Sequence, residues 1–264
     1  MVMTKAKVIG VIPARYQSSR FPGKVLADIL GKSLIRRTYE NMLKCELLEE
    51  LVIATDDMRV VNHAESFGAK AVMTLASHES GTDRAAQAIR DHFPHAEIVV
   101  NIQADEPCLH PKVVDTLICD MIANREAVMT TPVVKITDFE QITNPSIPKC
   151  VFDVNHKALY FSRQPIPYPC KIEHPDYYRH MGVYCFRSHF LQTYATLPYS
   201  RLRATEDLEQ LKVLDHGYPI HISIVEYDGV EVNHPDDIRK VEEFLCRENT
   251  SLSLEELSPL SARG

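Results

Sequence analysis

Short hydrophobic runs alternate with longer amphipathic stretches through the first half of the chain. The short apolar runs predict buried strands at 7–13, 50–56, 71–74 and 97–102. Apolar residues at helical spacing predict helices at 33–45, 57–68, 80–93 and 111–124. This alternation is typical of an α/β fold, with a mostly parallel sheet and helices on both faces.

The second half of the chain has a different pattern. Two β-rich runs on either side of Asn155-His156 predict a hairpin, and four prolines within 164–178 exclude a regular element there. Further elements are predicted as strands at 180–187 and 219–227 and helices near 188–196, 205–216 and 235–248. We therefore predict a single domain over 1–250, a β-rich arm inserted at about 132–185, and a flexible tail at 251–264.

Composition narrows the class of protein. The chain has 264 residues, 45% of them hydrophobic, and a formal net charge of −7, which is ordinary for a globular protein. The negative charge argues against a nucleic-acid partner, and no run approaches the ~18 apolar residues of a membrane span. Seven cysteines without a C-x-x-C pair indicate reduced thiols, so we expect a cytoplasmic protein without a disulfide framework.

The stretch PARYQSSRFPGK at 13–24 concentrates positive charge in this acidic chain. Residues 1–27 contain Arg15, Arg20 and Lys24 but no Asp or Glu. A triphosphate needs several cationic donors at close range, and the alternative is a solvated basic turn. The sequence GKS at 31–33 is not a P-loop, because the glycine required five residues earlier is Leu26.

The motif NIQADEP at 101–107 follows the most apolar predicted strand. Asp105 at the carboxyl end of that strand suits Mg²⁺, which is bound by one or two carboxylates together with phosphate oxygens. The alternative is an Asp that caps the next helix, but that helix begins only at Pro111. Ligands bind at the carboxyl ends of strands in such sheets, so 13–24, 54–57 and 103–107 are expected to share one crevice.

The motifs IPARYQSSRFPGK, ATDD, SGTDR, NIQADEP, ALYFSRQPIP, HMGVY and EDLEQLKVL, taken together, resemble the CMP-Kdo synthetases, or 3-deoxy-manno-octulosonate cytidylyltransferases. The resemblance runs from Val8 to Leu245. It implies a Rossmann-like nucleotidyltransferase that uses Mg²⁺ to transfer CMP from CTP to Kdo for lipopolysaccharide synthesis, with release of pyrophosphate. It also implies a homodimer formed through the β-rich arm.

The resemblance assigns roles to individual residues. Catalysis would fall to Arg15, Lys24 and Asp105. Nucleotide contacts would come from Pro13, Ala14, Arg15, Ser18, Arg20, Lys24, Ser80, Arg84 and Gln103. The sugar would meet Gln103, Arg163, His180, Tyr184, Glu209 and Gln210. Magnesium would lie at Asp105 and Asn233.

Two positions depart from the family pattern. Ala104 replaces a glycine beside Asp105, and Asn233 replaces an aspartate that is usually the second carboxylate on the metal. An amide oxygen can bind Mg²⁺ but brings no charge. Asp236 or Asp237 could compensate, although both suit the first turn of the last helix better.

Other functions stay open at this point. One alternative is a cytidylyltransferase for a related acid sugar, such as 8-amino-Kdo or sialic acid. Another is a relative that binds CTP without catalysis, which the missing charge at Asn233 would favour. A third is a dimeric scaffold that uses only the arm.

Overall fold

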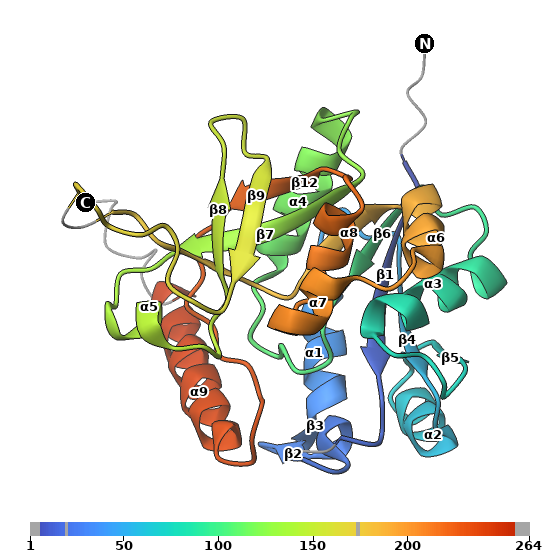
Figure 1. The fold of residues 1–264 in the computed structure, drawn as a ribbon. Coiled ribbons are helices and arrows are strands. Elements are labelled where there is room, and N and C mark those ends of the chain that lie inside the picture. The colour runs from blue at the N-terminus through green and yellow to red at the C-terminus, as the bar shows by residue number, and fades with distance from the viewer. Residues whose placement is uncertain (1–5, 19–20, 173–174, 257–264) are drawn as a thin grey trace, which may run out of the picture.

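The computed structural model describes residues 6–18, 21–172 and 175–256, which form an α/β fold around one ten-stranded sheet (Figure 1). The first half of the sheet is parallel, in the order β5-β4-β1-β6. Its strands are β1 (Val8–Ala14), β4 (Glu50–Thr55), β5 (Ala71–Met73) and β6 (Ile98–Asn101). The predicted strands of this half are confirmed.

The second half of the sheet is mixed. β11 (Tyr184–Arg187) runs antiparallel between β6 and β7 (Met129–Lys135), and β12 (Ile220–Ile224) runs parallel to β7. β10 (Tyr178–His180), β8 (Lys149–Phe152) and β9 (Ala158–Ser162) continue the sheet with antiparallel pairings. β12 is shorter than the predicted strand at 219–227.

Helices cover both faces of the sheet, as predicted. Alternate side chains of β1 point to opposite faces: Val8 and Ile12 belong to one hydrophobic cluster, and Ile9 and Val11 to the other. The first cluster includes α1 (Leu34–Met42), α2 (Met58–Ser66) and α4 (Pro111–Ala123). The second includes α3 (Gly81–His92), α6 (Ser188–Thr196) and α8 (Leu211–Asp215).

The predicted strand at 180–187 is interrupted, so the prediction of one strand is wrong. β10 and β11 both run along the same edge of β7, and the chain breaks between them, opposite Pro132. Met181 N–H donates to the Pro132 carbonyl at 3.2 Å, but proline has no N–H to return the second bond of an antiparallel pair. The Thr131 hydroxyl lies 3.3 Å from the Met181 carbonyl oxygen instead, and 2.8 Å from that of Val183.

The interruption shortens the chain between His180 and Tyr184. Four residues of a regular strand span about 13 Å. Here the two rings stack with their centroids 5.7 Å apart. Both side chains therefore face the same small region of the molecule.

The predicted helix at 205–216 is also divided. α7 (Arg201–Glu206) ends at Asp207, whose φ of 51° is left-handed, and α8 starts at Leu211. Glu209 and Gln210 lie in the connection, not on one helix face. The last helix, α9 (Asp237–Glu256), extends beyond the predicted 235–248. Short unpredicted elements are η1 (Lys24–Leu26), β2 (Asp28–Ile29), β3 (Lys32–Ser33) and α5 (Glu140–Thr143).

The predicted hairpin is confirmed as β8 and β9, with His156 in the left-handed region at a φ of 61°. The hairpin extends the main sheet at its end. Residues 164–172 and 175–177 contain no helix or strand, as the prolines predict. No helix in the described part of the chain is long and apolar enough to cross a bilayer. Dimerisation through the arm stays a prediction.

Lys149 organises the loop that joins α5 to the hairpin. Its side chain is fully buried, and Nζ donates to the carbonyl oxygens of Asn144, Ile147 and Arg163 at 3.0, 2.7 and 2.7 Å. These three bonds use all three ammonium protons. The loop at 144–148 is thereby held against the start of the segment that follows β9.

The substitution Lys149→Met should lower the free energy of unfolding by about 2–4 kcal/mol, because it leaves three carbonyl oxygens without a donor in a buried site. Urea denaturation measures the change. Lys157→Met, on the exposed turn of the hairpin, is the matched control and should change stability by less than about 0.5 kcal/mol. Equal effects of the two substitutions would show that the three bonds to Lys149 do not stabilise the loop.

Candidate active site

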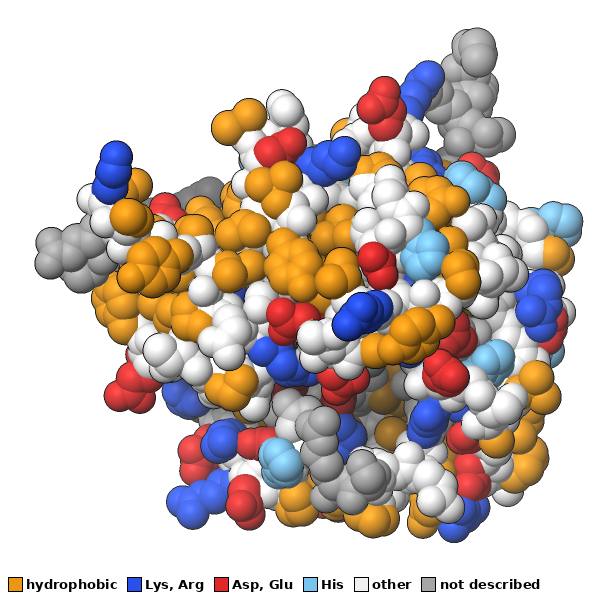
Figure 2. All heavy atoms as spheres, viewed as in Figure 1, with side chains coloured by type: hydrophobic (Ala, Val, Ile, Leu, Met, Phe, Trp, Pro, Cys, Tyr) orange, Lys and Arg blue, Asp and Glu red, His pale blue; other side chains and the backbone are white. Residues whose placement is uncertain are grey.

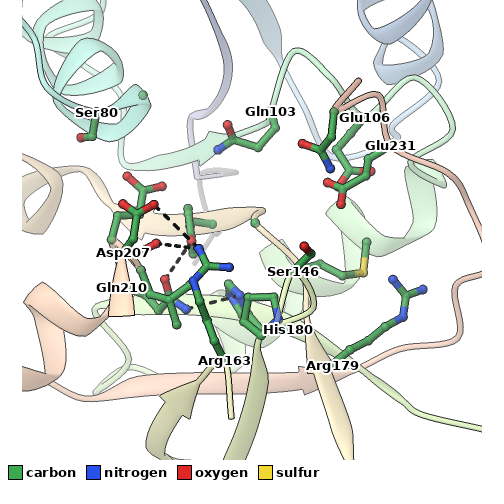
Figure 3. Close-up of a pocket in the computed structure, with 18 of the residues that line it drawn as sticks. Ser80, Gln103, Glu106, Ser146, Arg163, Arg179, His180, Asp207, Gln210 and Glu231 are labelled. Atoms are coloured by element: carbon green, nitrogen blue, oxygen red, sulfur yellow. Dashed lines mark hydrogen bonds and ion pairs between the residues drawn. The ribbon is translucent and has the colours of Figure 1, made fainter. Parts of the chain in front are cut away.

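Two adjoining pockets open at the carboxyl ends of the parallel strands. The smaller has a volume of about 450 Å³ and the larger about 890 Å³. Both are lined by Gly81, Gln103 and Asn233, so they meet at these residues. Figure 3 shows the larger pocket, with Gln103 at its upper border in this view, in the loop that follows β6.

The smaller pocket gathers most of the residues predicted to bind the nucleotide. They are Pro13, Arg15, Ser18, Lys24, Arg84 and Gln103, and the two residues predicted for the metal, Asp105 and Asn233, line the same pocket. Three predicted residues do not line it. Ala14 is buried, with its side chain in the hydrophobic core; Ser80 lines the larger pocket; and Arg20 lies outside the described residues.

Ser80 has a structural task at this place. Its hydroxyl accepts the backbone N–H of Asp83 at 3.1 Å, and the Asp83 carboxylate accepts the N–H of Ser80 at 3.2 Å. This capping box starts α3 at the pocket edge. It fixes Gly81 between the two pockets.

The loop after β1 is folded back by a left-handed glycine. Gly23 has a φ of 70° and donates its N–H to the Tyr16 carbonyl at 3.1 Å. The Tyr16 ring in turn lies under the Arg59 guanidinium, 3.5 Å from the ring centroid, which ties the loop to α2. This turn directs Lys24 into the smaller pocket.

Two arginines give the smaller pocket its positive character. Nη2 of Arg15 is buried without a hydrogen-bond partner, and the side chain of Arg84 is fully buried with Nε also unpartnered. Burial lowers the pKa of Arg84, the Asp56 carboxylate 3.0 Å away opposes that shift, and the nearby Arg15 adds to it. Unsatisfied donors on two neighbouring guanidinium groups suit an anion such as phosphate.

Asp105 already holds a cation in this structure. Nζ of Lys24 lies 2.6 Å from its Oδ2 and 3.0 Å from the Val232 carbonyl oxygen. The Val232 N–H donates to the Asp105 carbonyl at 2.9 Å, so the segment carrying Asn233 runs beside Asp105. Segments far apart in the sequence thus meet at one carboxylate.

The donor set fits Mg²⁺ only together with a ligand. Asp105 and Asn233 line the same pocket and offer one carboxylate and one amide oxygen. In the described residues, no three His, Cys, Asp or Glu side chains form a group that could hold a metal ion. Mg²⁺ commonly takes few protein ligands and completes its shell with phosphate oxygens and water, which matches this set.

Asp237 does not replace the missing charge. Its Oδ2 accepts the backbone N–H groups of Asn233 and His234 at 3.1 and 2.8 Å, and α9 begins at this residue. Asp237 therefore belongs to the first turn of the last helix, as predicted.

All six residues predicted for the sugar line the larger pocket: Gln103, Arg163, His180, Tyr184, Glu209 and Gln210. Three of them form a network. The Tyr184 hydroxyl donates to Oε1 of Gln210 at 3.2 Å, and Nε2 of Gln210 lies 3.4 Å from Nδ1 of His180. Nε2 of His180 lies 2.9 Å from the Thr131 hydroxyl.

This network assigns the protons of its members. Because the Gln210 amide donates to Nδ1 of His180, the ring carries its proton on Nε2. Burial lowers the pKa of His180 to about 3, so the ring is neutral near pH 7. One N–H of Gln210 remains for a bound ligand.

Arg163 reaches the larger pocket from the end of β9 (Figure 3), but most of its donors bind the main chain. Nε, Nη1 and Nη2 donate to the carbonyl oxygens of Glu206, Pro145 and Asp207 at 2.7, 2.9 and 3.1 Å. Its guanidinium therefore holds two walls of the pocket together. Two of its five N–H groups are left to meet a substrate.

The larger pocket is also lined by residues that the sequence did not predict, among them Glu106, Arg179, Tyr227 and Glu231. Figure 3 shows the Glu106 and Glu231 carboxyl groups facing each other. Burial, together with the Glu231 and Asp105 charges, raises the pKa of Glu106 to about 8, and the Tyr227 hydroxyl lies 3.0 Å from its Oε2. Glu106 lies within the motif NIQADEP, and Arg179 directly precedes the motif HMGVY.

Glu209 at the opposite wall is also shielded from water. Burial raises its pKa to about 7, against a hydrogen bond of 2.9 Å from the Thr82 hydroxyl. Glu106 and Glu209 therefore carry less negative charge near pH 7 than two exposed carboxylates would. This makes the pocket more tolerant of an acidic ligand.

Known proteins resemble the chain over nearly all of its length. The cytidylyltransferase family model matches residues 9–223. The 3-deoxy-manno-octulosonate cytidylyltransferase of Chlamydia abortus is 50% identical over 247 residues, covering 93% of this chain and 97% of that protein. The protein of the same name from Protochlamydia amoebophila is 46% identical over 251 residues, with coverage of 93% and 97%.

Solved structures agree with the fold. A CMP:2-keto-3-deoxy-manno-octonic acid synthetase complexed with CTP matches with a TM-score of 0.88 and 40% identity, over 92% of this chain and 100% of that one. A 4-diphosphocytidyl-2C-methyl-D-erythritol synthase from Anaerococcus prevotii matches with a TM-score of 0.62 over 92% of this chain and 100% of that one. At 11% identity, the second likeness concerns the fold alone.

His180 should stay neutral across the pH range in which the protein is folded. Its pKa of about 3 lies below the 6.5 of an ordinary histidine, so the unfolded chain takes up the proton first as the pH falls. The stability that this residue contributes is lost between about pH 6.5 and about pH 3. In histidine ring NMR spectra, the signals that vanish in His180→Asn should keep their shifts from about pH 8 to about pH 5. Movement of those signals with a midpoint near 6.5 would contradict the buried network.

Proposed function

The chain belongs to the cytidylyltransferase family, and we propose that it acts as a 3-deoxy-manno-octulosonate cytidylyltransferase. It transfers CMP from CTP to Kdo, releases pyrophosphate and so activates Kdo for lipopolysaccharide synthesis. The observation that carries this proposal is the pair of pockets that meet at Gly81, Gln103 and Asn233. A transfer between two substrates needs two sites whose ligands touch.

The smaller pocket suits the phosphates of CTP. Arg15 offers an unpartnered buried donor, and Arg84 lies behind it with its charge held by Asp56. Guanidinium groups bind phosphate oxygens through parallel hydrogen bonds, which orient as well as attract. Lys24 adds a third positive charge from the same loop.

The larger pocket suits a polyhydroxylated acid. Gln103, the remaining N–H of Gln210 and the free donors of Arg163 can receive hydroxyl and carboxylate oxygens. The network around His180 keeps Gln210 in one orientation, so a ligand meets a fixed donor. Preorganised donors of this kind favour one binding geometry.

The reaction places the two ligands at the junction of the pockets. The anomeric hydroxyl oxygen of the sugar forms a bond to the α-phosphorus, the bond from that phosphorus to the bridging oxygen breaks, and the hydroxyl proton is released. Catalysis rests on positioning and charge stabilisation, without a protein nucleophile. Gln103 borders both ligands, and Arg15 meets the charge that grows on the leaving pyrophosphate.

Mg²⁺ is part of this proposal. When bound, it would neutralise phosphate charge, and Asp105 and Asn233 are the residues that would hold it. The mixed donor set of one carboxylate and one amide supports a metal that arrives with phosphate oxygens.

We also infer a cytoplasmic homodimer. Buried thiols at Cys45, Cys108, Cys150 and Cys185 support a reducing compartment. Figure 2 shows hydrophobic side chains gathered over the β8–β9 hairpin and the segment after it. Large exposed residues there are Val154, Leu159, Tyr168 and Ile172. A patch of this kind favours burial against a second copy.

The proposed activity predicts pyrophosphate release when the protein is incubated with CTP, Kdo and Mg²⁺. Arg15→Ala should lower kcat/KM by about 100-fold, because it removes a donor to the charged phosphates. Arg90→Ala, at the other end of α3 and on the surface, is the matched control and should keep full activity. A panel of Kdo, 8-amino-Kdo and sialic acid identifies the sugar. If CTP binds but none of the three sugars leads to pyrophosphate release, the protein is the non-catalytic relative that binds CTP.

The dimer predicts a mass in solution of about twice the 30.0 kDa of one chain, measured by sedimentation. Leu159→Glu should convert the protein to monomers, because it puts a charge on the exposed β9 strand. Leu75→Glu, at a position exposed to the same degree (59% against 60%) but far from the hairpin, should leave the mass unchanged. A wild-type protein that sediments as a monomer would exclude the inferred dimer.

A further inference from the structure

Lys24 occupies the place beside Asp105 that a bound metal would need. Nζ and Oδ2 are 2.6 Å apart, and the two side chains are only 16% and 25% exposed. A lysine ammonium and a divalent cation cannot share one carboxylate oxygen at such distances without strong repulsion. In the ligand-free protein, the ion pair and metal binding to Asp105 therefore compete.

The same ammonium is also part of the phosphate pocket. Lys24 lines that pocket together with Arg15 and Arg84. Arg15 has an unpartnered donor and can take a phosphate without giving up a contact. Two of the three Lys24 ammonium protons are on Asp105 and the Val232 carbonyl, so Lys24 can give a phosphate more than one hydrogen bond only by leaving one of these partners. The Lys24 ammonium beside Asp105 and the same ammonium beside a phosphate thus correspond to two states of the pocket.

We propose that Lys24 acts as a resident cation that keeps Asp105 neutralised until a nucleotide triphosphate draws the lysine away and frees the carboxylate for the metal. The inference rests on the proposed function, because it assumes a triphosphate in the smaller pocket. It goes further by making metal binding at Asp105 depend on the nucleotide through one side chain.

The surroundings of the pair indicate that the lysine moves and the carboxylate stays. The backbone of Asp105 is joined to the segment around Val232 by the 2.9 Å hydrogen bond from the Val232 N–H to the Asp105 carbonyl. The Val232 side chain is fully buried in a cluster with Ile29, Leu34 and Val241. Lys24, by contrast, reaches Asp105 through a flexible four-carbon side chain from the short helix η1.

The arrangement makes nucleotide and metal binding cooperative. Without a triphosphate, a metal must break the ion pair and leave the ammonium without a partner. With a triphosphate, the ammonium gains phosphate oxygens, so the same displacement costs less. By linkage, the factor by which CTP tightens metal binding equals the factor by which the metal tightens CTP binding.

The test measures binding of Mn²⁺ by electron paramagnetic resonance, with and without CTP. Lys24→Gln keeps a donor for the Val232 carbonyl but removes the charge. It should tighten Mn²⁺ binding to the CTP-free protein by about tenfold, the size expected for a partly buried ion pair, while weakening CTP binding. The tightening of Mn²⁺ binding by CTP should shrink by a similar factor. Lys32→Gln, which removes a lysine paired with Glu40 elsewhere, should change neither.

Several outcomes separate this inference from the proposed function. Mn²⁺ affinity in CTP-free Lys24→Gln that equals or falls below wild type would overturn the resident-cation role, even where CTP binds normally. If Lys24→Gln is unstable, Lys24→Met provides a second measurement of the Mn²⁺ affinity of the CTP-free protein, and the same increase is expected. Failure of the wild-type protein to bind CTP in calorimetry would instead refute the proposed function. Asp105→Asn should abolish the gain in Lys24→Gln, and a persisting gain would place the metal elsewhere.

Discussion

Pro132 in β7 lacks a backbone N–H, and the geometry of the site depends on this missing donor. An antiparallel neighbour cannot complete its ladder opposite a proline, and the chain between β10 and β11 leaves the sheet at Met181–Val183. The Thr131 hydroxyl lies within hydrogen-bonding distance of the Met181 and Val183 carbonyls, which this break leaves without a partner in β7. It also lies within hydrogen-bonding distance of Nε2 of His180. The break brings Gly182 beside Gln103 and stacks His180 on Tyr184.

Electrostatics then divides the cavity into two parts with different chemistry. The smaller pocket keeps its charges: two arginines with unpartnered donors, and a lysine paired with Asp105. The larger pocket loses charge through burial, because His180 stays neutral and the pKa values of Glu106 and Glu209 are raised. A polyanion is thus attracted to one side, and a sugar acid meets mostly neutral hydrogen-bonding groups on the other.

The sequence predicts the first half of the fold well because its periodicity is local. The strands β1, β4, β5 and β6 are each a short apolar run, and the Ser80–Asp83 cap can be recognised from two residues three apart. β7 was missed because Pro132 argues against an inner strand, yet the strand lies between neighbours on both edges. The predicted helix at 205–216 is split because Asp207 has a left-handed backbone conformation. The spacing of hydrophobic residues does not predict such a conformation.

The same distinction applies to the site. Arg15, Lys24 and Asp105 stand in compact motifs, so their meeting could be expected from the rule that ligands bind at strand ends. The ion pair between Lys24 and Asp105 could not be expected from the sequence. The motifs indicate a triphosphate at Lys24 and Mg²⁺ at Asp105, and they do not indicate a contact between the two residues. Asn233 was expected beside Asp105 from the sequence, but Glu231 and Tyr227 were not, and the packing of Val232 beside Asp105 brings them to the pocket as well.

The most direct test of the account is a crystal structure of the protein with CTP and Mn²⁺. The account predicts the triphosphate in the smaller pocket, with Arg15 and Lys24 on its oxygens, Lys24 out of hydrogen-bonding range of Asp105, and the α-phosphate at Gln103. A triphosphate bound in the larger pocket, or bound in the smaller one with the Lys24–Asp105 pair intact, would contradict it.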